Sequence, residues 1–445
     1  MPVVLVVLDG LGDRPVPELG RDGDARGRTP SEAAATPQLD ALARRGASGW
    51  HVPFGWGWAP ASELAHWAMF GFDDVPFPGR AVLEAVGAGV DVPSGVAVTH
   101  AALRTSTVVE DRVWITGRSG GPDADDARAL LDALAPLAHR HRARLHPLGS
   151  HGEALLVLPD HPDGSVTDSD PFFSDRHPWL RVLPTVPNAS DTASALTALL
   201  LDAREVLGEH PVNAARVARR LPPLDVLTTK WSGALGPLPT FAEQTGVAGA
   251  AVTGTRLYRG LSRVLGMASR HHSPVADLAH DLRTRLAAAD ELIADGARFV
   301  HVHTKATDDA GHTKQPRAKL EVLEAADPAL AALHDLAERA VVAVTGDHAT
   351  PSTGGVLHTG DPTPLVVAGP TVRPDTVTAF GEAPAHAGWY GAVTARELLP
   401  LLFGHANRPV FLGHRATVRR TLALPDAPEP MRPSRGRRQP TTDRR

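Results

Sequence analysis

The sequence predicts an α/β fold in which a mostly parallel sheet is covered by helices on both faces. Four short apolar runs rich in β-branched residues predict the strands, at residues 3–8, 299–302, 341–344 and 364–367. Between them lie stretches such as residues 273–297, where leucine and alanine recur at helical spacing. Buried strands separated by helices are typical of a parallel sheet with both faces covered.

The composition limits the class of protein. The chain of 445 residues is long enough for two domains, or for one large core with an insertion. Its formal charge of -5 gives no global indication of a nucleic-acid partner or of an anionic membrane surface. The absence of cysteine excludes disulfides, thiolate metal sites and a cysteine nucleophile. A bound metal would therefore need oxygen and imidazole ligands.

The first apolar run is too short for a signal segment or a membrane span. No basic residue precedes it, and Asp9 follows it directly. We therefore expect a cytoplasmic protein without a membrane partner. The sequence does not indicate the oligomeric state.

The middle of the chain differs in amino-acid composition from its two ends. Residues 91–220 are rich in proline, histidine and arginine, and their apolar runs are shorter, which is typical of an inserted domain. We predict a core formed by residues 1–95 and 221–420, interrupted by a smaller cap or substrate domain at residues 96–220. Residues 421–445 are rich in proline and arginine without an apolar face, and we expect a disordered tail there.

Acidic and imidazole side chains follow three of the predicted strands. Asp9 follows the first run, Asp308 and His312 follow the second, and Asp347 and His348 follow the third. In open α/β sheets, ligands bind beyond the carboxyl ends of the strands. We therefore expect these distant segments to meet at one edge of the sheet.

With His358 on a later glycine-rich loop, these residues make two sets of carboxylate and imidazole that could hold two divalent cations. Such ligands suit Mn²⁺, Zn²⁺ or Mg²⁺. Two such ions, roughly 3.5 to 4 Å apart, clamp the attacking and leaving oxygens in phosphoryl displacement. The chemistry indicated is phosphoryl or sulfuryl transfer.

Each of these motifs, taken alone, has a simpler explanation than metal binding. An Asp-His dipeptide is usually surface or capping polarity, and Asp308 and Asp309 could cap a helix. The segments DDAGH, TGDH and GGVLHTGDP, each arriving after a strand, are much less expected together by chance.

The stretch WAPASELAHWAMFGF places Ser62 at the expected start of a helix. Free N–H groups and the helix dipole favour a phosphate there, so Ser62 is a candidate nucleophile. It could equally serve only as the N-cap. As a nucleophile it would depend on a cation, because metal coordination lowers the pKa of an oxygen acid by several units.

An ordered series of motifs runs from Val3 to about Arg415: VVLDGLGDRP, GRTPSEAAATPQLDALARRG, SELAHWAMFGF, GRAVLEAVGAGV, VTDSDP, EHPVNAARVARRLPP, GVAGAAVTGTRLYRGLSRVLGM, HVHTKATDDAGH, VTGDHATP and HTGDPTPLVVAG. This series resembles the archaeal-type cofactor-independent phosphoglycerate mutases of the alkaline phosphatase superfamily. The resemblance implies an alkaline-phosphatase-like core with a smaller inserted cap domain.

The resemblance also implies the chemistry of the site. Ser62 would be the nucleophile, which is phosphorylated transiently while bound glycerate reorients. The substrate would be a small phosphorylated carboxylate, 2- or 3-phosphoglycerate, and Mn²⁺ would be the expected cation. The implied ligands form two sets: Asp308, His312 and His358 for one cation, and Asp9, Asp347, His348 and Ser62 for the other.

The chain departs from the family pattern at several positions. The Gly-Ser-Asp of the family is Ala-Ser-Glu at residues 61–63, and its Arg-Cys-Asn is Thr-His-Ala at residues 99–101. An arginine becomes Leu158 and a histidine becomes Phe172. Losing two bidentate arginine contacts would weaken substrate binding by roughly two to four powers of ten, which is enough to change the substrate.

Five residues are candidates for binding the substrate. The basic ones, which could compensate for the lost arginines, are Arg80, Lys230 and Lys305. Asp168 and Asp170 could orient the retained alcohol or relay a proton, although aspartate and serine before a proline also favour a simple turn.

Three functions are consistent with these residues. The first, which we predict, is interconversion of 2- and 3-phosphoglycerate. The second is a hydrolase or transferase that acts on another phosphoester or a phosphonate with the same two-metal core, and the altered cap residues favour it. The third is a silent binding protein with a structural metal site. The presence of a nucleophile and of every expected ligand argues against the third function.

Overall fold

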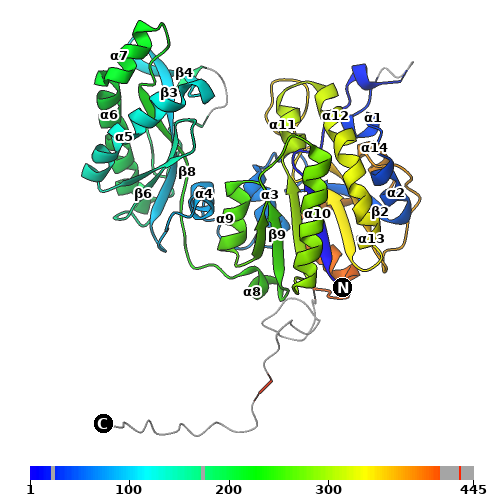
Figure 1. The fold of residues 1–445 in the computed structure, drawn as a ribbon. Coiled ribbons are helices and arrows are strands. Elements are labelled where there is room, and N and C mark those ends of the chain that lie inside the picture. The colour runs from blue at the N-terminus through cyan, green and yellow to red at the C-terminus, as the bar shows by residue number, and fades with distance from the viewer. Residues whose placement is uncertain (22–25, 172–175, 411–429, 432–445) are drawn as a thin grey trace, which may run out of the picture.

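The computed structural model describes residues 1–21, 26–171, 176–410 and 430–431, which form two lobes. Within these residues, we call the part built on an eight-stranded sheet the larger lobe, and the part built on a six-stranded sheet the smaller lobe. Figure 1 shows the two lobes side by side, with helix α4 (Arg80–Ala88) between them. Among the described helices, none is long and apolar enough to cross a membrane.

Within the described residues, the sheet of the larger lobe has the strand order β10-β9-β11-β1-β12-β13-β2-β14. Strand β13 runs antiparallel to β12 and β2, and the other neighbours in the sheet are parallel. The prediction of a mostly parallel sheet in an α/β fold is therefore confirmed. The strands are β1 (Val3–Leu8), β2 (Ala47–Val52), β9 (Gly249–Thr253), β10 (Ala268–His271), β11 (Phe299–Thr304), β12 (Val341–Thr345), β13 (Thr363–Ala368) and β14 (Ala392–Thr394).

Strand β1 lies at the centre of this sheet, and all its residues are buried. Alternate side chains point to opposite faces of a strand. Val3, Leu5 and Val7 join one apolar cluster, while Val4 and Val6 join the other. Fully burying one such side chain contributes about 1.5–3 kcal/mol. The continuous apolar run in the sequence thus reflects burial on both faces.

Two layers of helices provide these clusters. The first cluster includes residues of α3 (Ser62–Met69), α8 (Phe241–Thr245), α9 (Arg256–Val264) and α15 (Ala395–His405). The second includes residues of α2 (Pro37–Arg45), α10 (Leu278–Ala294), α12 (Pro316–Ala326) and α13 (Ala332–Leu336). Shorter helices α1 (Pro30–Ala33), α11 (Ala306–His312) and α14 (Glu382–His386) lie near the strand ends.

The smaller lobe is an antiparallel sheet in which β8 pairs with β3 beside the path β5-β6-β3-β4-β7. Helices α5 and α6 share an apolar cluster with one face, and α4 packs on the other. The elements are β3 (Ala97–Val109), β4 (Arg112–Arg118), α5 (Ala124–Arg140), β5 (Arg144–Leu148), β6 (Glu153–Leu158), β7 (His177–Pro178), α6 (Ser190–Glu209), α7 (Pro211–Ala218) and β8 (Val226–Ala234).

Strand β8 bears on the predicted domain boundaries. The predicted insertion at residues 96–220 contains β3 to β7 but not β8, although β8 pairs with β3 along most of its length. We therefore propose that the insertion extends to residue 234, because a strand belongs with the sheet that satisfies its backbone hydrogen bonds. Residues 411–420, and residues 421–445 of the predicted tail apart from 430 and 431, lie outside the described residues.

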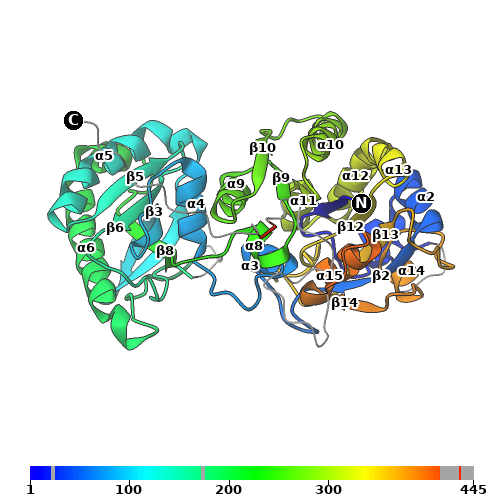
Figure 2. The same cartoon turned by 90° about the horizontal axis from the view of Figure 1, so that it is seen from below.

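The two lobes meet where α4 crosses α9, as Figure 2 shows from below. A glycine from each helix lies at the crossing. A Cβ atom on Gly260 would lie 1.7 Å from the carbonyl oxygen of Leu83, and one on Gly87 would lie 2.0 Å from that of Arg256. Arg259 also donates from Nε to the carbonyl of Gly87, at 2.6 Å. The helices can approach this closely only because both positions lack a side chain.

A Gly260→Ala variant is expected to be less stable than the wild type by about 1–3 kcal/mol, because the added methyl group overpacks the crossing. Urea unfolding measures this change. The matched control is Gly208→Ala in α6, where an added Cβ would meet nothing within 4 Å. That variant is expected to gain about 0.5–1 kcal/mol from helix propensity. If both variants were stabilised alike, the close crossing of α4 and α9 would be refuted.

Candidate metal centre and active site

The site lies at the carboxyl ends of three neighbouring strands. Strand β1 pairs in parallel with β11 on one side and β12 on the other. Leu8 lies opposite Thr304, and Val7 lies opposite Thr345, so the three strands end at nearly the same level. The segments that follow these strands carry the predicted acids. Parallel pairing therefore brings Asp9 close to Asp308 and Asp347, which are far from it in the sequence.

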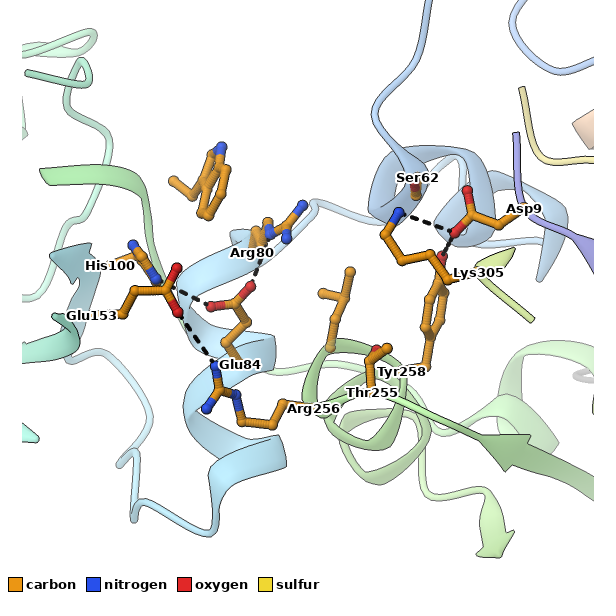
Figure 3. A pocket seen from close by; sticks show the side chains of 12 residues that line it. Asp9, Ser62, Arg80, Glu84, His100, Glu153, Thr255, Arg256, Tyr258 and Lys305 are labelled. Atoms are coloured by element: carbon orange, nitrogen blue, oxygen red, sulfur yellow. Dashed lines mark hydrogen bonds and ion pairs between the residues drawn. The ribbon is translucent and has the colours of Figure 1, made fainter. Parts of the chain in front are cut away.

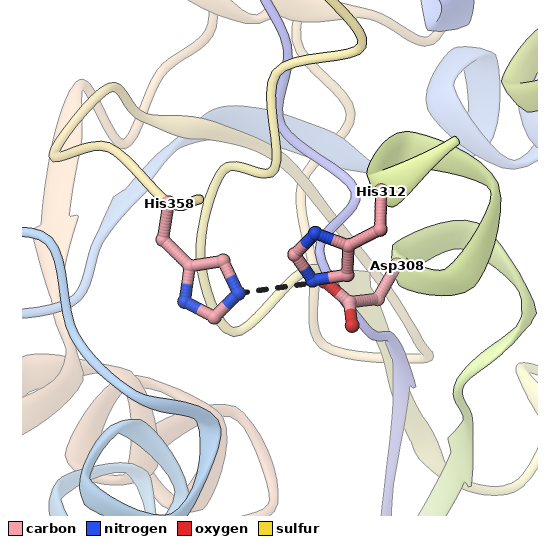
Figure 4. Close-up of side chains that lie close together, drawn as sticks. All are labelled: Asp308, His312 and His358. Atoms are coloured by element: carbon pink, nitrogen blue, oxygen red, sulfur yellow. Dashed lines mark ion pairs between the residues drawn. The ribbon is translucent and has the colours of Figure 1, made fainter. Parts of the chain in front are cut away.

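The first ligand set consists of Asp308, His312 and His358, which Figure 4 shows facing one another. Oδ1 of Asp308 lies 3.2 Å from Nε2 of His312 and 3.6 Å from Nε2 of His358. Nδ1 of His358 lies 3.0 Å from the carbonyl oxygen of Pro60, to which it can donate. This bond turns Nε2 of His358 toward the other two ligands, and Nε2 itself has no hydrogen-bond partner in the described residues.

The second ligand set consists of Asp9, Asp347 and His348, all fully buried. Nε2 of His348 lies 3.4 Å from Oδ1 of Asp9 and 3.4 Å from Oδ2 of Asp347. Neither carboxylate oxygen has a hydrogen-bond partner among the described residues. Buried carboxylate oxygens without partners are costly, and a bound cation would remove that cost.

Electrostatics also indicates that the second ligand set needs positive charge. Burial, reinforced by the charge of Asp347, raises the pKa of Asp9 to about 6. Burial likewise raises the pKa of Asp347 to about 6. Two carboxyl groups that resist ionisation would release their protons when a divalent cation binds. The donor atoms of both sets therefore fit two divalent cations, with oxygen and imidazole ligands.

Ser62 reaches the second ligand set from α3. The residue that caps this helix is Ala61, and Ser62 is the first residue within the helix. The simpler explanation, that Ser62 is the N-cap, is therefore wrong. Its Oγ lies instead 2.9 Å from Nε2 of His348. Asp308 likewise lies inside α11, which Lys305 caps without a side-chain hydrogen bond.

Several residues that support the ligands were not found from the sequence. Tyr258 donates from its hydroxyl to Oδ2 of Asp9 at 3.2 Å, and Nε2 of His303 lies 2.9 Å from the same oxygen. On Asp347, Oδ1 accepts from the backbone N–H of Gly10 at 2.9 Å. One oxygen of each carboxylate is thus held by the protein, which leaves the other free for a cation.

A fully buried lysine, Lys319, ties the loops of the site together. Its Nζ donates to the carbonyl oxygens of Gly12 and Thr350, both at 2.9 Å, and pairs with Oδ2 of Asp13 at 3.0 Å. Asp13 in turn accepts from the backbone N–H of Ser352 at 3.0 Å. This network joins α12 to the loops that follow β1 and β12, and so fixes the backbone next to both ligand sets.

A cavity of about 240 Å³ lies between the two lobes, beside the second ligand set (Figure 3). The larger lobe contributes Ser62 and Tyr258, and the smaller lobe contributes His100, Glu153 and Trp231. A neighbouring cavity of about 450 Å³ shares Ser62 and Trp231 with it and reaches all three residues of the first ligand set. A ligand in these cavities would touch both lobes and the candidate nucleophile.

Two of the predicted substrate-binding residues line both cavities. Lys305 pairs through Nζ with Oδ2 of Asp308 and lies 3.7 Å from Oδ2 of Asp9. Arg80 forms two ion pairs, from Nη1 to Oε2 of Glu63 at 3.2 Å and from Nε to Oε1 of Glu84 at 2.9 Å. The charged groups of Lys305 and Arg80 therefore line the same cavities as the hydroxyl of Ser62.

The structure does not bring Asp168, Asp170 and Lys230 to these two cavities. Asp170 is buried, and its carboxylate pairs with Arg104 at 2.9 Å and with Lys230 at 3.4 Å. Asp168 accepts from the backbone N–H of Trp231 at 2.8 Å. Their contacts lie within the smaller lobe, so a role in substrate binding stays a prediction for these three residues.

The residues of the smaller lobe that depart from the family pattern lie in different environments. His100 is buried and lines the cavity of about 240 Å³. Leu158 lies in β6 within the apolar cluster of the smaller lobe. Phe172 lies outside the described residues.

Comparison with known proteins agrees with this geometry. The chain matches the family described as the Metalloenzyme superfamily over residues 1–403. It is 32% identical to the 2,3-bisphosphoglycerate-independent phosphoglycerate mutase of Ignicoccus hospitalis over 416 residues, which cover 92% of this chain and 98% of that protein.

Two solved structures are also similar to this chain. The PH0037 protein of Pyrococcus horikoshii has a TM-score of 0.75 at 29% identity, covering 93% of this chain and 99% of that one. The cofactor-independent phosphoglycerate mutase of Thermoplasma acidophilum has a TM-score of 0.59 at 29% identity, covering 91% and 99%. The chain thus belongs to the Metalloenzyme superfamily and, within it, to the 2,3-bisphosphoglycerate-independent phosphoglycerate mutases, which confirms the resemblance seen in the sequence.

A Tyr258→Phe variant is expected to bind Mn²⁺ about tenfold more weakly, because Asp9 loses one of the donors that fix its orientation. Calorimetric titration of chelator-treated protein with Mn²⁺ measures the affinity. The chain has only two tyrosines, and Tyr390→Phe is the matched control, since that hydroxyl contacts His405 rather than a candidate ligand. Equal affinity in Tyr258→Phe and the wild type would refute the supporting role of Tyr258.

Proposed function

We propose that the protein interconverts 2- and 3-phosphoglycerate by metal-dependent phosphoryl transfer through Ser62. The observation that carries this proposal is the position of the Ser62 hydroxyl, 2.9 Å from His348 and on the wall of a cavity shared by both lobes. Membership of the mutase family supports the choice of substrate. A cytoplasmic, glycolytic role follows as part of the same proposal.

Two divalent cations would be held by the ligand sets described above, with Ser62 completing the second set. We propose Mn²⁺, while Zn²⁺ and Mg²⁺ suit the same donor atoms. When bound, the cations would supply the positive charge that acidifies the Ser62 hydroxyl and offsets charge on the phosphoryl oxygens.

The chain's own residues would then carry the transfer. The Oγ atom of Ser62 forms a bond to phosphorus as the bond from phosphorus to the glycerate oxygen breaks. The hydroxyl proton of Ser62 is lost, and the released glycerate oxygen gains a proton. Glycerate turns within the cavity, its other hydroxyl attacks the phosphoserine, and the same exchange in reverse restores Ser62. The cavity walls must exclude water meanwhile, because water would hydrolyse the phosphoserine.

Lys305 and Arg80 would hold the anionic groups of the substrate. Lys305 contacts Asp308 and Asp9 and lines the same two cavities as Ser62. Its ammonium group would meet a phosphoryl oxygen there. Arg80 presents a planar guanidinium at the same cavities, and such a group suits a phosphate or a carboxylate.

A Ser62→Ala variant is expected to lose transfer by a factor of about 10³ or more while it stays folded, because the phosphoryl acceptor is gone. A coupled assay measures 2-phosphoglycerate formed from 3-phosphoglycerate with Mn²⁺, and circular dichroism checks the fold. Ser94→Ala is the matched control, since Ser94 is exposed and bonds only a carbonyl in the smaller lobe.

Full activity in Ser62→Ala would reject the nucleophile. A panel of phosphomonoesters and phosphonates, assayed beside 3-phosphoglycerate, tests the substrate. If the wild type turned over one of these compounds but formed no 2-phosphoglycerate, the protein would instead be a hydrolase or transferase with the same metal core.

A further inference from the structure

One tryptophan of the smaller lobe has an unusual backbone. Trp231, in β8, has a φ angle of 59°, in the left-handed region that bulky residues rarely adopt. The pairing of β3 with β8 is irregular at the same place, between Val98 and His100. Strained residues of this kind persist only where the surrounding structure holds them, and they are frequent at functional sites.

A set of hydrogen bonds holds this strained turn. Asp168 accepts from the backbone N–H of Trp231 at 2.8 Å. Thr99 donates from its hydroxyl to the carbonyl oxygen of Lys230 at 3.2 Å, and Ser232 donates to the Thr99 hydroxyl at 2.7 Å. The residues on either side of Trp231 are thus fixed by β3, and Trp231 itself by Asp168.

Two of the residues that depart from the family pattern take part in this arrangement. Thr99 bonds the backbone carbonyl of Lys230 on one side of Trp231 and the side-chain hydroxyl of Ser232 on the other. The ring of His100 lies 5.1 Å from the indole. The departures at residues 99 and 100 therefore support an aromatic side chain.

The indole of Trp231 packs against the guanidinium of Arg80, which lines the active-site cavity. The Cζ atom of Arg80 is 4.0 Å from the ring centroid, well within the range of a cation–π interaction. In the plane of the guanidinium, Nη1 of Arg80 contacts Glu63 and Nε contacts Glu84. Within the described residues Nη2 has no protein hydrogen-bond partner. Figure 3 shows Arg80 between His100 of the smaller lobe and Ser62 of the larger lobe.

We propose that Trp231 is a positioning residue that fixes the guanidinium of Arg80, so that its free edge meets the phosphate or carboxylate of the substrate beside Ser62. The indole covers one face of the guanidinium while Glu63 and Glu84 fix two of its edges, which leaves little freedom for the group to turn. This inference rests on the proposed function, because it assigns the substrate's anionic group to Arg80. The smaller lobe would then influence substrate binding through Trp231, without touching the reacting atoms.

The test compares Trp231→Leu with Trp231→Phe in the Mn²⁺-loaded full-length protein. Trp231→Leu removes the aromatic face and is expected to raise the KM for 3-phosphoglycerate about tenfold with a much smaller change in kcat. Trp231→Phe keeps an aromatic face and is expected to recover most of that loss. Trp389→Leu is the matched control, since Trp389 is exposed and lies 5.4 Å from Arg373.

A double-mutant cycle separates positioning from general packing. If Trp231 acts through Arg80, then Trp231→Leu should change KM little further in an Arg80→Gln background. Full additivity of the two changes would overturn the proposal, and so would an unchanged KM in Trp231→Leu. Urea unfolding of each variant shows whether a loss reflects a damaged fold, in which case the Trp231→Phe comparison decides.

A binding measurement keeps this inference distinct from the proposed reaction. Inorganic phosphate is titrated calorimetrically into the Mn²⁺-loaded wild type and into Trp231→Leu. An affinity about tenfold lower in the variant would support the positioning role even if no 2-phosphoglycerate is formed. Equal phosphate affinity in the two proteins would refute that role, whether or not the protein is a mutase.

Discussion

The parallel pairing of β1 with β11 and β12 brings the candidate ligands together. It places Asp9, Asp308 and Asp347 at the same edge of the sheet, although Asp9 is far from the other two in the sequence. Burial makes this arrangement costly, as the raised pKa values of Asp9 and Asp347 indicate. Two divalent cations would remove that cost, so the fold and the chemistry follow from the same packing of strands.

The smaller lobe closes one side of the cavities beside the two ligand sets. It approaches the larger lobe at the crossing of α4 and α9, where two glycines allow close contact, and its sheet contributes walls to both cavities. Arg80 at the start of α4 contacts Glu63, the neighbour of the candidate nucleophile Ser62, and the indole of Trp231. The lobes are therefore linked through charged side chains at the site as well as by apolar packing.

Much of the metal core could be predicted from the sequence, because buried strands leave continuous apolar runs and the candidate ligands follow them directly. Tyr258 and Lys319 could not be found in this way, since their partners are 249 and 306 positions away and no local pattern marks the contact. His303 had a visible signal, because it alternates with His301 along β11. The boundary predicted at residue 220 rests on composition, which does not show that β8 pairs with β3, and that pairing supports the proposal that the insertion extends to residue 234.

We propose that the two ligand sets hold two cations and that Ser62 contacts one of them. Anomalous diffraction at the manganese edge, from crystals grown with Mn²⁺, tests this proposal. We expect two peaks roughly 3.5–4 Å apart. One should be bounded by Asp308, His312 and His358, and the other should contact Asp9, Asp347, His348 and the Oγ atom of Ser62. A single peak, or a second ion out of contact with Ser62, would contradict it.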